Sequence, residues 1–234
     1  IGQLNRSNPF DPFSMTVAAI INASYLNGVS ELHSEVAKKM WVNIWKDIPM
    51  EHVPIKAITN GIHTKSWISN EMGDLFERYL GDNWEERQEE PNLWEKVSKI
   101  PHPEIWSAHQ IGRRRLVRFV RKRVKKQLIN KGASKVLIKG ASEVLNPEAL
   151  TIGFARRFAT YKRGDLILRD KERLLKILND EERPVQFVIA GKSHPQDNHG
   201  KEIIRRIIHF IKNYNLEKKV IFIEDYDMNV ARYM

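Results

Sequence analysis

The sequence predicts an α/β protein in which a parallel β-sheet is covered by helices. Beyond about residue 145, three short apolar runs alternate with stretches of helical periodicity, which is typical of such a sheet. Up to about residue 131 the periodicity is mostly helical and is interrupted by seven prolines, which indicates a separate helical part.

The first part is expected to contain three helices. The apolar segment at residues 15–25 predicts a buried helix, which Asn27 and Gly28 should end. A second, amphipathic helix is predicted by four apolar residues at helical spacing: Val29, Leu32, Val36 and Met40. A long helix over about residues 103–130 closes this part, with Gly132 as its C-terminal stop.

The second part should contain three strands separated by helices. Apolar runs at residues 150–155, 185–190 and 220–223 predict the strands, and helical periodicity at residues 166–178 and 201–214 predicts the helices. In a parallel sheet of this kind, ligands bind at the carboxyl ends of the strands.

Composition excludes several classes of protein. Of the 234 residues, 41% are hydrophobic and 29% are charged, which is typical of a globular rather than a disordered protein. No apolar run approaches the roughly 18–20 residues that cross a bilayer, and the first residues do not resemble a signal peptide. The absence of cysteine excludes disulfides, thiolate catalysis and cysteine-based zinc sites, and it is compatible with the cytoplasm, the expected location.

The net charge of +10 predicts an anionic partner, such as a nucleic acid, an acidic surface or a phosphorylated small molecule. Much of the excess lies at residues 113–126, where the basic residues surround an apolar stripe of the long helix. We interpret this run as a solvated or interdomain helix face, because no aromatic residues alternate with the cations as in a site for single strands.

The residues that follow the predicted strands favour an anion site. Arg157 and Lys162 follow the first strand, where we expect the chain to enter a helix whose N-terminus would add free N–H groups. Gly191 and Lys192 follow the second strand, without the spacing of a Walker loop, and Tyr226 follows the third. An anion-binding cleft is therefore predicted, and a basic surface turn is the alternative.

The sequence resembles a known family, the glycogen and α-glucan phosphorylases. Five blocks carry the resemblance, in the family's order: NGVSELHSE (27–35), TNGIHT with Trp67 (59–67), TIGFARRFATYKR (151–163), GK (191–192) and EDY (224–226). They cover nearly the whole chain and are more similar to the short bacterial and archaeal enzymes than to the long animal ones.

The resemblance implies roles for eight residues. Arg157 and Lys162 match the two cations that contact the substrate phosphate, and they are the expected catalytic residues. Asn60 would hydrogen-bond a sugar hydroxyl, and Tyr161 matches a tyrosine near the sugar. Four residues are expected at the cofactor, pyridoxal 5'-phosphate: Arg156, Trp67, Lys192 and Tyr226.

It also implies a GT-B-like architecture, with two Rossmann-type domains that face each other across a cleft. Residues 1–60 would be the helical C-terminal tail of the first domain, and residues 61–234 the helical entry and first strands of the second. The implied activity is phosphorolysis of terminal α-1,4 bonds of glycogen or maltodextrin by inorganic phosphate, which releases glucose 1-phosphate. We expect a homo-oligomer with no nucleic-acid or membrane partner.

Some features depart from the family. Ser24 stands where the animal enzymes have a histidine three residues before the Asn-Gly pair. The family's cofactor lysine lies downstream of the third strand, and its glycine-rich loop lies upstream, so both are absent from this sequence. Ile1 is not an initiator Met, and residues 230–234 have a helix-like pattern. We therefore expect both ends to be cut and these 234 residues to be inactive alone.

Two other functions are compatible with parts of the sequence. A nucleotide-sugar glycosyltransferase such as glycogen synthase shares the fold and also uses Arg and Lys at strand ends, but it is not expected to carry the second and third blocks together. A basic module could instead bind nucleic acid through residues 113–126, with steeply salt-dependent affinity.

No metal site is predicted. His33 and Glu35 are two residues apart on a helix and point in different directions, so packing and capping roles are expected. His63 and His194 should lie in loops with structural or solvated roles. Five tryptophans are expected to anchor the core or the packing of domains: Trp41, Trp45, Trp84, Trp94 and Trp106.

Overall fold

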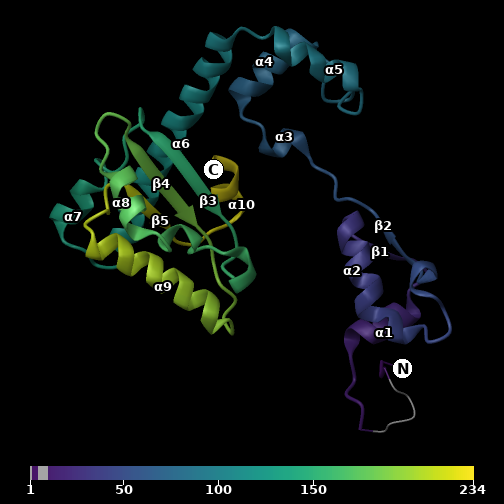
Figure 1. Ribbon diagram of the computed structural model, residues 1–234. Coiled ribbons are helices and arrows are strands. Elements are labelled where there is room, and N and C mark those ends of the chain that lie inside the picture. Colours follow the sequence, from purple (N-terminus) through teal and green to yellow (C-terminus); the bar gives the residue numbers. More distant parts are fainter. Residues whose placement is uncertain (1, 5–9) are drawn as a thin grey trace. The chain divides into compact units, whose positions relative to one another are not determined.

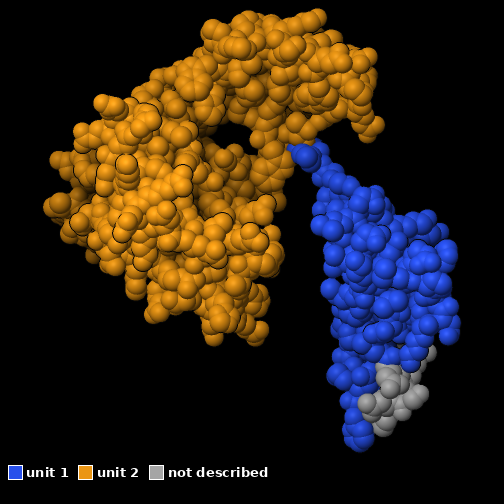
Figure 2. Space-filling model, in the orientation of Figure 1, with its two compact units in different colours: residues 1–63 blue, residues 64–234 orange. Residues whose placement is uncertain are grey.

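In the computed structural model, which describes residues 2–4 and 10–234, the chain divides into two compact units (Figure 1). Unit 1 is Ile1–His63 and unit 2 is Thr64–Met234, coloured blue and orange in Figure 2. Both units combine helices with parallel strands, so the α/β class is confirmed. The assignment of residues 1–60 and 61–234 to two GT-B-like domains stays a prediction. In the part of the chain that the structure describes, no helix is long and apolar enough to span a membrane.

Unit 1 is a small layer of helices on two short strands. It contains α1 (Met15–Asn22), β1 (Leu26–Gly28), α2 (Glu31–Trp41) and β2 (Ile55–Ala57), with 3₁₀ turns at Val42–Ile44 and Met50–His52. The strands pair in parallel, with Gly28 opposite Ala57. Ser34 of α2 is buried, and its Oγ donates to the Ile55 carbonyl at 3.1 Å. A Cβ at Gly28 would lie 2.6 Å from Ser34 N, so this close approach requires glycine.

The first predicted helix is shorter than expected. α1 ends at Asn22, whose side-chain amide donates to the Ala18 carbonyl at 2.7 Å. Residues 26–28, expected to end a helix, form β1 instead because they pair with a strand almost thirty residues away. α2 starts at Glu31, after Val29, because Ser30 caps it. The expected capping role of His33 is confirmed, since its Nδ1 accepts from Val29 N at 3.1 Å.

Unit 2 holds the larger sheet and most of the helices. Its helices are α3 (Thr64–Trp67), α4 (Asn70–Leu80), α5 (Pro91–Glu95), α6 (His102–Asn130), α7 (Lys135–Gly140), α8 (Lys171–Leu178), α9 (Asn198–Asn213) and α10 (Met228–Tyr233). Short 3₁₀ helices are Lys96–Lys99, Thr160–Lys162 and Leu166–Leu168. The strands are β3 (Leu150–Ala155), β4 (Val185–Ala190) and β5 (Val220–Ile223), which confirms the predicted bounds residue for residue. They pair in parallel in the order β3-β4-β5.

Each face of this sheet carries its own apolar core. Phe187 and Ile189 of β4 pack in a cluster with residues of α8 and α9. Val188 and Ala190, on the alternate positions, pack in a second cluster with residues of α6 and α10. Figure 1 shows α9 and α10 on opposite sides of the sheet. A central strand buried on both faces explains why β4 is an unbroken apolar run apart from Gln186.

The helix predicted over residues 166–178 is interrupted. Leu166–Leu168 is a 3₁₀ turn, and α8 starts only at Lys171. The reason is a new N-cap, because Asp170 Oδ1 accepts from Arg173 N at 3.0 Å. The long helix and the helix over residues 201–214 are confirmed, although α9 starts three residues early, at Asn198.

The basic run on α6 is partly engaged inside unit 2. Arg121 donates from Nε to the Val144 carbonyl at 2.9 Å and from Nη2 to the Leu145 carbonyl at 2.8 Å. Arg123 Nη2 lies 3.7 Å from Asp227 Oδ2, and the side chain of Arg113, which pairs with Glu148, is only 10% exposed. These guanidinium groups therefore join α6 to the loops around the sheet.

α6 also completes the outer edge of β5. The amide of Gln127 donates to the Phe222 carbonyl at 3.2 Å and accepts from Glu224 N at 3.1 Å. A neighbouring strand would satisfy the same two backbone groups. The end of β5 is thus held in place by a helix side chain.

The tryptophans differ from one another in burial. Trp84 is buried, with its ring centroid 5.2 Å from that of Phe76, as expected for a core residue. Trp94 packs edge-on against both rings, although 36% of it is exposed. Trp106 is 54% exposed on α6, so a core role is wrong for it, and a role in domain packing stays a prediction; the centre of its ring lies 5.7 Å from Arg113 Cζ.

We predict that Gln186→Met loosens the start of the β3–β4 pair. Gln186 is buried, and its amide joins both backbone groups of Asn146 at 2.7 and 2.8 Å and Thr151 Oγ1 at 2.7 Å. Leaving these groups without partners should lower the local opening free energy by about 1–3 kcal/mol. Hydrogen exchange of the amides of residues 144–152 in the full-length protein would measure it. Gln196→Met, on an exposed loop, is the control; equal protection in both variants would contradict the prediction.

Candidate functional site

The three strands of unit 2 end level with one another. In the parallel register, Ala155 lies opposite Ala190, and Ala190 lies opposite Ile223. The three residues that follow the strands therefore emerge side by side at one edge of the sheet, which we call the carboxyl edge. This arrangement is what the sequence predicted for the strand ends.

The loops after β3 and β4 stay paired beyond the strands. Arg156 N donates to the Ala190 carbonyl at 3.1 Å, and Phe158 N donates to the Lys192 carbonyl at 2.8 Å. Gly191 makes this possible, because a Cβ there would lie 2.1 Å from the Arg156 carbonyl oxygen. The two loops thus form one connected platform at the carboxyl edge.

This platform carries most of the predicted site residues. Arg156, Arg157 and Lys192 are exposed on it. Lys162 is half-buried in the 3₁₀ turn, with its Nζ 4.8 Å from the centre of the Tyr161 ring, which is 76% exposed. The structure therefore brings five of the eight predicted residues onto two adjacent loops.

The expected helix N-terminus beside Arg157 and Lys162 is not there. A short 3₁₀ turn follows instead, and the chain leaves it at Arg163, which has the left-handed φ of 53°. α8 starts several residues later, at Lys171. The segment after β3 therefore contributes positive charge through its side chains, because no α-helix starts within it.

The cations of the platform have no acidic partner. Within residues 2–4 and 10–234, no carboxylate forms an ion pair with any of these five side chains: Arg156, Arg157, Lys162, Arg163 and Lys192. Elsewhere in unit 2 such pairs are common, for example Arg206 with Asp165 at 2.6 Å. A group of cations without counter-charge on one surface is suited to bind an anion such as phosphate.

Two of the three acidic residues after β5 have cationic partners. Glu224 pairs with Lys131, which directly follows α6, and Asp227 lies 3.7 Å from Arg123. These two carboxylates are thus paired with cations other than those of the first two loops. Tyr226, between these acids, is half-buried, and its hydroxyl lies 3.5 Å from the Ala155 carbonyl at the end of β3.

Trp67 lies in a cavity of unit 2 with a volume of about 400 Å³. The other walls include Arg115 of α6 and Asn229, Arg232 and Tyr233 of α10. The helix α10 begins two residues after Tyr226, so Trp67 and Tyr226 belong to neighbouring parts of the unit.

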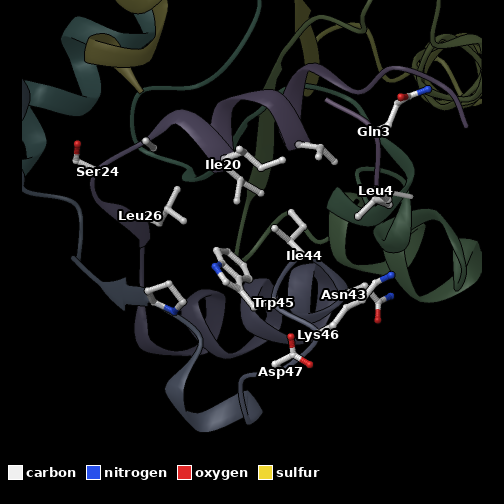
Figure 3. Close-up of a pocket in the computed structure, with 14 residues that line it drawn as sticks. Gln3, Leu4, Ile20, Ser24, Leu26, Asn43, Ile44, Trp45, Lys46 and Asp47 are labelled. Carbon is white, nitrogen blue, oxygen red and sulfur yellow. The ribbon is translucent and has the colours of Figure 1, made fainter. Parts of the chain in front are cut away.

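Asn60 belongs to unit 1, where it is exposed in the segment that follows β2. Unit 1 also has a larger cavity of about 610 Å³, in which the indole of Trp45 faces Ile20 and Leu26 (Figure 3). Ser24 lies at its margin, but none of the eight predicted site residues lines it.

No metal site accompanies these residues. In the described ranges, no group of three His, Asp or Glu side chains is placed to hold a metal ion. The structural role expected for His194 is confirmed, since its Nδ1 accepts from Gln196 N at 3.2 Å within the loop.

Sequence reasoning missed one residue of the platform. Phe158 stands between Arg157 and Lys162 and is fully buried, with Gly164, Gly191 and Gly200 packed around it. A phenylalanine within a charged segment, with glycines further along the chain, was the available signal. Its importance depends on contacts between distant parts of the sequence.

Comparison with known proteins gives a consistent result. A family model described as Carbohydrate phosphorylase matches residues 7–234. The chain is 42% identical to the maltodextrin phosphorylase of Thermococcus litoralis, over 99% of this chain and 27% of that protein. It is 41% identical to the glycogen phosphorylase of Aquifex aeolicus, over 97% of this chain and 33% of that protein.

A third relative, the glycogen phosphorylase of Mycobacterium tuberculosis, is 34% identical over 94% of this chain and 25% of its own length. The chain thus spans about a quarter to a third of the length of these relatives. The family match covers nearly every residue, including all eight predicted site residues. The chain belongs to the carbohydrate phosphorylase family.

Proposed function

We propose that the full-length protein is an α-glucan phosphorylase. It cleaves the terminal α-1,4 bond of glycogen or maltodextrin with inorganic phosphate and releases glucose 1-phosphate. The relatives named maltodextrin phosphorylase and glycogen phosphorylase support this reaction. The observation that carries it is the platform at the carboxyl edge, where cations without acidic partners gather in a member of this family.

Arg157 and Lys162 are proposed to hold the attacking phosphate. The new bond joins a phosphate oxygen to C1 of the terminal glucose, while the bond from C1 to the glucan oxygen breaks and that oxygen takes up the proton that the attacking hydrogen phosphate gives up. Charge on the phosphate and on the departing oxygen has to be stabilised at the same place. Fixed cations suit this task because they are already oriented when the reaction begins. Tyr161, exposed beside Lys162, and Asn60 of unit 1 are proposed to contact the sugar.

The cofactor is proposed to be pyridoxal 5'-phosphate, and the residues present suit its two parts. Arg156 and Lys192 are exposed cations with no acidic partner in the described chain, which fits a phosphate group. Tyr226 is half-buried and Trp67 is 49% exposed, so both present aromatic surface. Such a surface suits contact with a pyridine ring. When bound, the cofactor would supply a phosphate group able to exchange a proton with the substrate phosphate. No carboxylate of the platform is then needed as a general acid.

The proposed architecture is GT-B-like, with unit 1 and unit 2 belonging to two Rossmann-type domains. The parallel strands in each unit support this proposal. The strand order β3-β4-β5, with crossovers through α8 and α9, is also what one half of a Rossmann-type sheet requires.

The nucleic-acid alternative has weaker support. Arg113, Arg121 and Arg123, which lie in the basic run of α6, are engaged with groups inside unit 2. A phosphate backbone would have to compete with these contacts. A nucleotide-sugar glycosyltransferase would take glucose from UDP- or ADP-glucose. The next experiment separates it from a phosphorylase by comparing this transfer with phosphorolysis.

We predict that Arg157→Ala and Lys162→Ala each lower kcat/KM for phosphate by about 100-fold or more, the scale on which one preorganised donor acts. The measurement is release of glucose 1-phosphate from maltodextrin and phosphate by the full-length protein with cofactor. Arg183→Ala removes an equal charge at the opposite, amino end of β4, where the side chain is 85% exposed, and should leave activity unchanged.

Two results would contradict this proposal. Wild-type protein that transfers glucose from UDP- or ADP-glucose but performs no phosphorolysis would assign the synthase-like function instead. Equal losses of activity in Arg183→Ala and Arg157→Ala would show that overall charge, and not this platform, controls the rate.

We predict that Arg156→Ala and Lys192→Ala weaken the binding of pyridoxal 5'-phosphate by about tenfold each, because each removes a charge-assisted contact worth about 1.5–3 kcal/mol. Titration of the apo full-length protein with the cofactor, followed by absorbance, would measure the affinity. Lys212→Ala, on the last turn of α9, is the matched control. Unchanged affinity in both variants would exclude these two residues from the cofactor site.

A further inference from the structure

We propose that Phe158 is a positioning residue that fixes the phosphate-binding pair Arg157 and Lys162. This inference rests on the proposed function and adds a residue to its site. It follows from the position of the Phe158 ring and from the absence, in the described part of the chain, of hydrogen bonds and ion pairs that would orient the two cations.

The two cations have little of their own to hold them. In the described part of the chain, neither the Arg157 nor the Lys162 side chain forms a hydrogen bond to protein or an ion pair; Lys162 only approaches the Tyr161 ring at 4.8 Å. Their direction therefore depends on the backbone between them. Among residues 156–163, Phe158 alone is buried, with 0% of its surface exposed.

The ring of Phe158 occupies a space that two glycines leave open, and a third glycine lies against its backbone carbonyl. A Cβ at Gly164 would lie 2.6 Å from its Cε1, and a Cβ at Gly191 would lie 2.6 Å from its Cε2. A Cβ at Gly200, in the first turn of α9, would lie 2.4 Å from the Phe158 carbonyl oxygen. Any larger residue at these positions would displace Phe158, so its place is determined from three sides.

The same residue joins this segment to the sheet. Its ring lies 5.7 Å from that of Phe154 in β3 and 5.9 Å from that of Phe222 in β5. Its backbone N–H donates to the Lys192 carbonyl at 2.8 Å. Beyond Lys162 the segment is held again, where Asp165 pairs with Arg206 of α9 at 2.6 Å. Phe158 is thus the buried anchor next to Arg157, and without it the chain between β3 and Asp165 has no other buried side chain.

Small displacements matter at such a site. A phosphate held by two cations needs both at hydrogen-bond distance at once, and rate losses of about 100-fold can follow a 1 Å misplacement. Loss of the ring should therefore affect the phosphate step more than the binding of glucan.

The test compares two Phe→Ala variants of the full-length protein with its cofactor. Phe158→Ala should weaken binding of inorganic phosphate, measured by calorimetry, by about tenfold or more, with the KM for maltodextrin changed less than about twofold. Phe210→Ala removes an equally buried ring from the same core cluster, on α9. It should lower the melting temperature without changing phosphate affinity. Equal phosphate affinity in the two variants would overturn the inference.

A second variant covers the case in which Phe158→Ala does not fold. Gly164→Ala adds one methyl group against the ring, at a position where φ lies outside the left-handed region. It should also weaken phosphate binding, and the smaller side chain of Phe158→Leu in the same protein should restore part of the affinity. Wild-type phosphate affinity in a folded Gly164→Ala protein would overturn the inference.

These outcomes separate the inference from the proposed function. If the wild-type protein binds phosphate but forms no glucose 1-phosphate, the reaction is wrong, while a selective effect of Phe158→Ala still supports positioning. If phosphorolysis occurs and Phe158→Ala behaves like Phe210→Ala, positioning alone is wrong.

Discussion

The backbones that follow β3 and β4 approach each other at Gly191 so closely that no side chain fits between them. A Cβ at that residue would lie 2.1 Å from the Arg156 carbonyl oxygen and 2.6 Å from the Phe158 ring. The approach follows from the parallel register, which places Ala155 opposite Ala190 and continues for several residues past the strands. Because the two loops are joined in this way, the cations that they carry share one surface. The candidate site depends on this contact more than on any single charge.

The distribution of charge in unit 2 follows the same structure. Glu224 and Asp227, which follow β5, are paired with Lys131 and Arg123, and several arginines of α6 are engaged with carboxylates or carbonyl groups. The loops after β3 and β4 have no such compensation among the described residues. A net charge of +10 by itself suggested several kinds of anionic partner. The pairing pattern favours a small anion at the carboxyl edge over a long polyanion along α6.

The sheet of unit 2 could be predicted because its strands are nearly continuous apolar runs between polar segments, and two of them, β4 and β5, are mostly buried. Elements that depend on distant contacts could not. Residues 26–28 form β1 only because residues 55–57 lie beside them, and local sequence favoured a turn there. The cap at Asp170 divided a helix whose periodicity looked continuous.

The candidate site shows the same difference. Arg157, Lys162 and Lys192 were found because polar residues after neighbouring parallel strands meet at one edge, and Arg156 was found from the resemblance to the phosphorylases. Phe158 was missed because its burial depends on Gly191 and Gly200, which are far along the chain. Trp106 was expected to anchor the core or the packing of domains; it is not in the core, because a long helix with one buried stripe has room for an exposed aromatic residue.

The most direct test of this account is a crystal structure of the full-length protein with inorganic phosphate bound. The account predicts phosphate on the platform, within hydrogen-bond distance of both Arg157 and Lys162, with the Phe158 ring still packed against Gly164 and Gly191. Phosphate found instead in the cavity beside Trp67, Arg115 and Arg232, with Arg157 and Lys162 unoccupied, would contradict it.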